Sequence, residues 1–138
     1  MLTSSNGPEL RCEVRVDATP DVVPQIRRRI TRFAAENDAI AQADIALAVS
    51  EAVTNVVQHA YRDGASGEVR IVACQYPDEL VVVVRDYGCG MRPNPNSPGA
   101  GLGLSIIGAS ASEMNVERPA DGGTRIRLRF RRLAQAAA

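Results

Sequence analysis

The 138-residue sequence has no excess of charge of either sign, since 16 basic residues are balanced by 16 acidic ones. Such a chain has no overall field that would attract nucleic acid or an anionic membrane, so we expect neither as a direct partner. No apolar run approaches the roughly 20 residues needed to span a bilayer, and the first residues lack the basic start and apolar stretch of a signal peptide. We therefore expect a cytoplasmic protein.

Cysteine and histidine are too few to suggest a disulfide framework or a His-rich metal site. Cys12, Cys74 and Cys89 are odd in number and form no C-x-x-C pair, which is typical of incidental thiols in a reducing compartment. The only histidine is His59. The remaining composition, 45% hydrophobic, is ordinary, and the length suits one domain over 1–138 with a single core. We expect the ends, residues 1–8 and 134–138, to be frayed.

The hydrophobic pattern predicts an α+β order of elements. Alternation or apolar runs between turn signals predict five strands, over Leu10–Asp17, Glu68–Gln75, Glu79–Arg85, Asn115–Arg118 and Thr124–Arg131. Helical spacing of apolar residues predicts three helices, over Pro20–Glu36, Gln42–Tyr61 and Leu102–Glu113. The order predicts a two-layer sandwich, with helices on one face of a mainly antiparallel mixed sheet.

The segment EAVTNVVQHAY, residues 51–61, places polar side chains one helical turn apart. At 100° per residue, Asn55 lies roughly 40° round the helix from Glu51, and His59 lies another ~40° further. Gln58 falls beside Glu51, and the opposite side carries the apolar residues Val49, Val53, Val56 and Ala60. This division is typical of a solvated surface helix. It also fits a site, because a carboxylate and an amide oxygen one turn apart suit magnesium.

Two glycine-rich segments follow, RDYGCGM at residues 85–91 and GAGLGLS at residues 99–105. Asp86 ends an apolar strand, and the second segment precedes a predicted helix whose free N–H groups would suit phosphate. The spacing matches neither a Walker loop nor a Rossmann fingerprint. A flexible linker is the alternative interpretation. The adjoining strand and helix favour a functional loop.

Together these segments resemble the GHKL superfamily of ATP-binding domains, which implies a Bergerat-type fold. The resemblance rests on four boxes in order along the chain: a helix with Glu51, Asn55 and His59, a D-x-G-x-G box with Asp86, Gly88 and Gly90, a G-x-G box with Gly101 and Gly103, and Gly123-Thr124 entering the last strand. The short length and the segment SEAVTNVVQHAY look most like bacterial anti-sigma-factor serine/threonine kinases.

The resemblance implies ATP and Mg²⁺ as cofactors. Asn55 would bind the magnesium ion, and Glu51 would be the catalytic general base toward a serine or threonine hydroxyl of a partner protein. Asp86 would accept a hydrogen bond from the adenine amino group. Gly90 and Thr124 would complete the adenine pocket, and Gly99, Gly101, Leu102 and Gly103 would lie near the phosphates. Gly88 would also belong to the nucleotide-binding set.

Two of these residues have a second interpretation. His59 would either assist nucleotide binding or form a structural hydrogen bond near the helix end. Asp86 has the alternative role of a turn residue at the end of a strand.

The loop before the G-x-G box departs from the kinases that the chain resembles. Those kinases carry a basic residue immediately before the phosphate-loop glycines, whereas this chain reads Asn96-Ser97-Pro98-Gly99-Ala100. The nearest upstream cation is Arg92. A missing cation at the transferring phosphate would slow phosphoryl transfer, so nucleotide binding is better supported than efficient transfer.

Three functions are compatible with these features. The first is an anti-sigma factor and kinase whose partners are a sigma factor and an anti-sigma antagonist of the STAS type. The second is a nucleotide-binding module that regulates a partner without transferring phosphate. The third, a detached sensor-kinase ATPase domain, is disfavoured because no dimerisation helix or phosphoacceptor histidine segment is visible. The RRRITR segment, residues 27–32, is either a solvated face or a partner surface, which leaves a homodimer possible.

Overall fold

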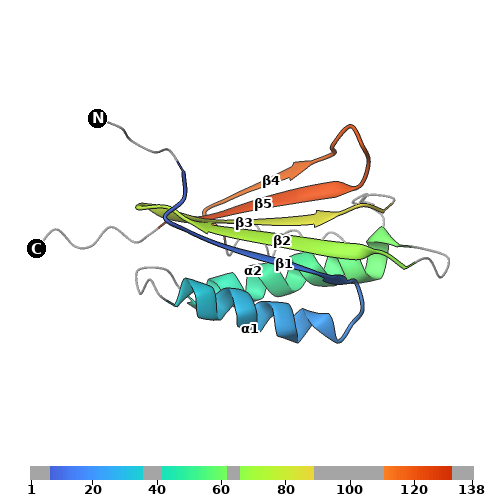
Figure 1. The fold of residues 1–138 in the computed structure, drawn as a ribbon, viewed down its shortest axis with the longest axis horizontal. Coiled ribbons are helices and arrows are strands. Elements are labelled where there is room, and N and C mark those ends of the chain that lie inside the picture. The colour runs from blue at the N-terminus through green and yellow to red at the C-terminus, as the bar shows by residue number, and fades with distance from the viewer. Residues whose placement is uncertain (1–6, 36–41, 62–65, 89–110, 132–138) are drawn as a thin grey trace, which may run out of the picture.

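A sheet of five strands lies over two helices in the computed structural model, which describes residues 7–35, 42–61, 66–88 and 111–131 (Figure 1). The strands are β1 (Leu10–Asp17), β2 (Glu68–Gln75), β3 (Glu79–Asp86), β4 (Glu113–Glu117) and β5 (Thr124–Arg131). Their order across the sheet is β1-β2-β3-β5-β4, and every pairing between them is antiparallel. The predicted α+β two-layer fold is therefore confirmed, with a sheet that is antiparallel throughout these strands rather than mixed.

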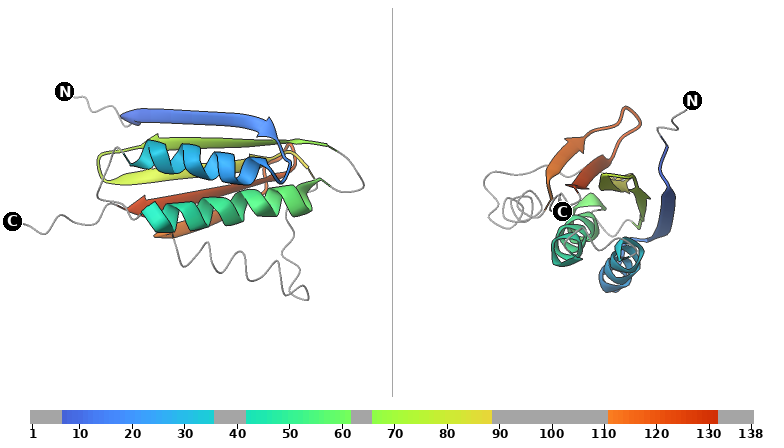
Figure 2. Two further views of the ribbon diagram at one scale, coloured as in Figure 1. Left: turned by 90° about the horizontal axis from the view of Figure 1, so that it is seen from below. Right: turned by 90° about the vertical axis from the view of Figure 1, so that its left-hand side faces the viewer.

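Both described helices pack against the same face of the sheet (Figure 2). Helix α1 runs over Val22–Ala34, and helix α2 runs over Gln42–Asn55 and continues as a π-helical turn, η1 (Val56–Ala60). The predicted extent of the second helix is close to that of α2 and η1 together. The change to π-helical hydrogen bonding at Val56 was not predicted, because the side-chain pattern does not show it. No described helix is long and apolar enough to cross a bilayer.

The predicted helix over Leu102–Glu113 is wrong at its C-terminal end, and its residues up to 110 lie outside the described ranges. Strand β4 begins at Glu113, two residues before the predicted strand. The backbone N–H of Ser112 already donates to the carbonyl of Arg129 at 2.8 Å. Pairing with β5 therefore determines the conformation here, and local helical spacing does not.

Alternation along the strands divides the sheet into two faces. Every second residue of β2, β3 and β5 points toward the helices and is buried, as the period of two requires. Against them pack the apolar stripes of α1 and α2, and the core comprises chiefly Ile26, Ile30, Ile45, Val49, Val53, Val56, Ile71, Leu80, Val82, Val84, Ile126, Leu128 and Phe130. The apolar side predicted for the second helix is confirmed, since Val49, Val53, Val56 and Ala60 are all buried.

The turn between β4 and β5 depends on two glycines in the left-handed region. Gly122 has φ +98° and Gly123 has φ +78°. A Cβ atom at Gly122 would meet nothing within 4 Å, whereas one at Gly123 would lie 2.1 Å from the carbonyl oxygen of Asp86. The turn predicted at Asp121-Gly122-Gly123 is thus confirmed, and its second glycine is also required for contact with the end of β3.

We predict that Gly123→Ala destabilises the fold far more than Gly122→Ala does. Both substitutions carry the cost of a positive φ, about 1 kcal/mol each, but only Gly123→Ala adds a collision with backbone, so its cost should exceed about 3 kcal/mol. Urea unfolding monitored by circular dichroism measures both values. Equal losses in the two variants would contradict the close contact at Gly123.

Candidate functional site

Asp86 is the last residue of β3 and is 1% exposed. Its side chain points to the helix-facing side of the sheet, the same side as Val84 and the other core side chains of β3. Directly across the sheet its partner is Thr124, the first residue of β5, which is also buried. Two residues predicted to lie in one pocket, 38 positions apart in the sequence, are therefore brought together by strand pairing.

The carboxylate of Asp86 has one occupied oxygen and one free oxygen. Oδ1 accepts a hydrogen bond of 3.0 Å from the backbone N–H of Gly88, the local turn that an aspartate favours at a strand end. Oδ2 is buried and has no hydrogen-bond partner in the described part of the chain. The turn-residue interpretation accounts for Oδ1 alone. A buried acceptor without a donor is costly, so Oδ2 is suited to accept a hydrogen bond from a donor group of a ligand.

Burial raises the pKa of the Asp86 carboxyl above its ordinary value of 3.8. The backbone N–H groups of Gly88 and Thr124 and the positive charge of Arg85 act in the opposite direction, and burial outweighs them. Without a ligand this environment favours the uncharged carboxyl, whereas a ligand donor hydrogen-bonded to Oδ2 would favour the carboxylate.

Gly88 brings the end of β3 against the end of the α2–η1 helix. A Cβ atom at Gly88 would lie 2.0 Å from the carbonyl oxygen of Ala60, the last residue of η1. Only a residue without a side chain permits this approach. The predicted role of Gly88 in a nucleotide pocket stays a prediction, and the structure adds a packing role for it.

Asn55 is the last residue of α2 and is 6% exposed. Ala60, whose carbonyl lies against the Gly88 backbone, follows it by five residues at the end of η1. A buried mid-helix amide is not part of a solvated face, so that interpretation of the polar strip is wrong for Asn55. It holds for Gln58, which is exposed, while Glu51 and His59 are partly buried.

Tyr61 is a residue of the site region that the sequence did not single out. Its hydroxyl donates to the backbone carbonyl of Glu68 at 2.5 Å and accepts a 2.9 Å hydrogen bond from the N–H of Tyr87. These two bonds connect the end of the helix to the start of β2 and to the residue after Asp86. Burial raises the pKa of the Tyr61 hydroxyl, which keeps it a neutral donor. A tyrosine closing an apolar helix was the available signal.

The other predicted site residues lie outside the described ranges: Gly90, Gly99, Gly101, Leu102 and Gly103, together with Cys89 and Arg92. Their roles stay predictions. In the described residues, no group of three or more His, Cys, Asp or Glu side chains could hold a metal ion. Any magnesium held by Asn55 would need most of its ligands from the phosphates and from water, which is usual for this ion.

Comparison with known proteins assigns this arrangement to a family. The histidine kinase-like ATPase domain matches residues 16–130, a range that includes α1, α2, the strands β2 to β4, and β5 except for its last residue. The chain belongs to this family.

Two curated relatives are similar over little more than half of the chain. A serine-protein kinase, RsbW, of Bacillus pumilus is 39% identical over 80 residues, 55% of this chain and 49% of that protein. An anti-sigma F factor of Clostridium novyi is 33% identical over 94 residues, 60% of this chain and 66% of that protein. The matched region thus spans about half the length of the kinase relative and two thirds of the anti-sigma relative.

Among solved structures, the ATP-binding domain of PrrB from Mycobacterium tuberculosis is similar in fold. The TM-score is 0.52 at 22% identity, covering 88% of this chain and 98% of that domain. This similarity supports the fold assignment of the histidine kinase-like ATPase domain, and at this identity it supports the fold alone.

The raised pKa of Asp86 predicts a pH-dependent effect of Asp86→Asn on stability. Between 3.8 and the higher folded pKa, the folded state holds a proton that the unfolded state has lost, so the stability contributed by this carboxyl falls as the pH rises. Asn carries no ionisable group. The unfolding free energy of the variant, relative to the unsubstituted protein, should therefore increase from below pH 3.8 to neutral pH.

Urea unfolding of both proteins across this pH range measures the difference directly. A difference that does not change with pH would contradict the burial of an ionisable carboxyl at this position.

Proposed function

We propose that this chain binds ATP with Mg²⁺ and acts as an anti-sigma factor and serine/threonine protein kinase that phosphorylates an anti-sigma antagonist. Family membership supports the ATP-binding part, and the names of the two curated relatives support the kinase and anti-sigma parts. We place its action in the cytoplasm, where such partners and reduced cysteines are found.

The observation that carries the proposal is the unpaired Oδ2 of Asp86. It is a fixed acceptor at the end of a buried strand, and it faces the helix layer beside Gly88 and Thr124. The adenine base presents an exocyclic amino donor, whereas guanine presents a carbonyl acceptor at the same place. Asp86 is therefore suited to accept a hydrogen bond from adenine and to disfavour guanine.

Asn55 is the residue that we propose holds Mg²⁺. Its amide oxygen is a ligand type that this ion accepts, and its burial near the helix end restricts the side chain to few rotamers. When bound, Mg²⁺ neutralises charge on the transferring phosphoryl group. His59 and the four glycine-loop residues Gly99, Gly101, Leu102 and Gly103 would complete the nucleotide contacts, with Gly90 beside adenine.

Glu51 lies one helical turn before Asn55 on the same helix. It is partly buried. In the proposed reaction, Glu51 orients the hydroxyl of a partner's serine or threonine and takes its proton. The partners would be a sigma factor and a STAS-type antagonist.

A nucleotide-binding regulator without efficient transfer is the second candidate function. The observation that favours it is the absence of Arg or Lys from residues 96–100. Phosphoryl transfer depends on charge neutralisation at the terminal phosphate, whereas binding of the adenosine part does not.

We predict that Asp86→Asn weakens ATP binding about 10- to 100-fold, since one charged hydrogen bond contributes about 1.5–3 kcal/mol. The preference for ATP over GTP should shrink in the same variant. Isothermal titration with each nucleotide and Mg²⁺ measures both effects.

Asp78→Asn is the matched control. Asp78 is an exposed carboxylate in the turn between β2 and β3, and its replacement by Asn makes the same change in charge as Asp86→Asn. It should bind ATP as the unsubstituted protein does. Unchanged ATP affinity in Asp86→Asn would refute the adenine pocket.

We predict that Glu51→Gln slows phosphoryl transfer about 10²- to 10⁴-fold while ATP affinity stays within about threefold. The assay combines labelled ATP, Mg²⁺ and purified candidate antagonist proteins. Asp44→Asn, an exposed carboxylate on the same helix, is the control and should retain full transfer. Tight ATP binding with no transfer by the unsubstituted protein would refute the kinase and leave the regulator.

A further inference from the structure

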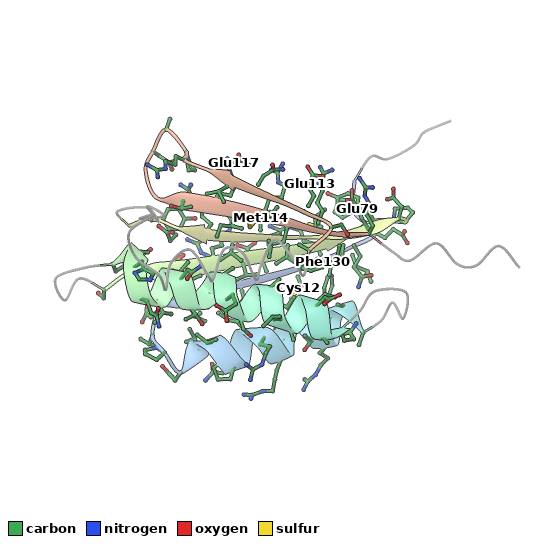
Figure 3. All side chains as sticks on the ribbon, turned by 180° about the vertical axis from the view of Figure 1, so that it is seen from behind. Cys12, Glu79, Glu113, Met114, Glu117 and Phe130 are labelled. Atoms are coloured by element: carbon green, nitrogen blue, oxygen red, sulfur yellow. The ribbon has the colours of Figure 1, made fainter. Side chains whose placement is uncertain are left out.

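The face of the sheet opposite the helices is rich in arginine. Strand β5 directs Arg125, Arg127, Arg129 and Arg131 to this side, because they alternate with its buried apolar residues. In Figure 3, Glu79, Glu113 and Glu117 lie on this side, while Cys12 and Phe130 point toward the helices. No described helix covers this face.

A hollow of about 430 Å³ lies on this face, where β1, β2, β3 and β5 run side by side. Its lining includes the apolar residues Val72 and Val83, together with Tyr87 and Asp121. Five guanidinium groups surround it, those of Arg11, Arg70, Arg85, Arg125 and Arg127.

Three carboxylates pair with these five arginines. Glu13 pairs with Arg11 at 2.9 Å and with Arg70 at 2.7 Å. Glu117 pairs with Arg125 at 3.1 Å and with Arg127 at 3.8 Å, and Asp121 pairs with Arg85 at 3.0 Å. Five positive groups against three negative ones leave an excess of two positive charges around the hollow.

Arg85 is the central group of this cluster. It is only 7% exposed, and its guanidinium stacks over the Tyr87 ring at 4.7 Å. Nη2 donates to Asp121, but Nη1 is buried and has no hydrogen-bond partner among the described residues. Nε of Arg125 is also buried and has no hydrogen-bond partner among the described residues. A buried charged donor left unpaired is costly, so these two N–H groups are suited to donate hydrogen bonds to an acceptor on a ligand.

We propose that this hollow binds an oxyanion with two negative charges, either inorganic phosphate or a phosphate monoester. Guanidinium groups match the oxygens of a phosphate with parallel hydrogen bonds, and two charges balance the excess of the cluster. The site is distinct from the proposed nucleotide pocket. Arg85 and Asp86 are consecutive residues of β3, so their side chains point to opposite faces of the sheet.

Asp121 competes with such a ligand for Arg85. Its carboxylate is 74% exposed, so replacing it does not disturb the core. Asp121→Asn removes one negative charge from the rim, and we expect it to raise phosphate affinity about three- to tenfold. A gain in binding cannot result from loss of folding, which makes this the decisive variant. Asp78→Asn makes the same change in charge in the turn between β2 and β3, at the other end of β3 from Arg85, and should leave the affinity unchanged.

The experiment is a titration of the ¹⁵N-labelled full chain with sodium phosphate at low ionic strength, followed by NMR. We expect saturable shifts at Arg85, Tyr87 and Asp121, with a Kd of about 1 mM or tighter. Arg85→Gln should weaken binding about tenfold or more. Arg127→Gln, at a more exposed position, should weaken it about threefold and serves if Arg85→Gln does not fold.

A parallel titration with phosphoserine distinguishes the two sources of the same chemistry. Equal binding of both indicates that the free ion suffices, and tighter binding of phosphoserine indicates a monoester ligand; either result supports the site. The proposal is overturned if no binding saturates, if Asp121→Asn leaves the affinity unchanged, or if the shifts fall on residues 51–61. Because Asp86→Asn should leave phosphate binding intact, failure of the nucleotide pocket and failure of this site are distinguishable.

Discussion

Two glycines, each packed so closely against a backbone carbonyl that a side chain would not fit, fix the end of β3. Gly88 lies against the carbonyl of Ala60 at the end of η1, and Gly123 lies against the carbonyl of Asp86 itself. These contacts join the second helix, the central strand and the β4–β5 turn at one point. The buried Asp86 carboxylate is positioned by this packing, so the geometry of the candidate ATP site depends on it.

The pleat of β3 then separates two kinds of chemistry by a single residue. Asp86 is an acceptor on the helix side, and Arg85 is a donor on the open side, because successive side chains of a strand point to opposite faces. Each has one atom that no described residue satisfies. Asp121, in the turn that contains Gly123, pairs with Arg85. The two faces therefore share the same supporting turn.

Much of the fold could be predicted from local pattern. Strands β1, β2 and β5 have the predicted bounds, since clear alternation and strong turn residues mark both ends. The start of β4 could not be predicted, because Glu113 and Met114 also fit a helical spacing and only pairing with β5 favours a strand. The π-helical turn was missed for a similar reason: the residue pattern of Val56–Ala60 is the same for either kind of helix.

The order of the described strands and helices, the family resemblance and the residue types of the candidate site all follow from the sequence alone. Those features are local, because propensity, periodicity and motif spacing are properties of neighbouring residues. Three features depend on the folded chain: Asn55 is buried rather than solvated, one oxygen of Asp86 has no partner among the described residues, and five arginines from four strands surround one hollow. Burial and pairing are set by residues far apart in the chain, which the fold alone brings together.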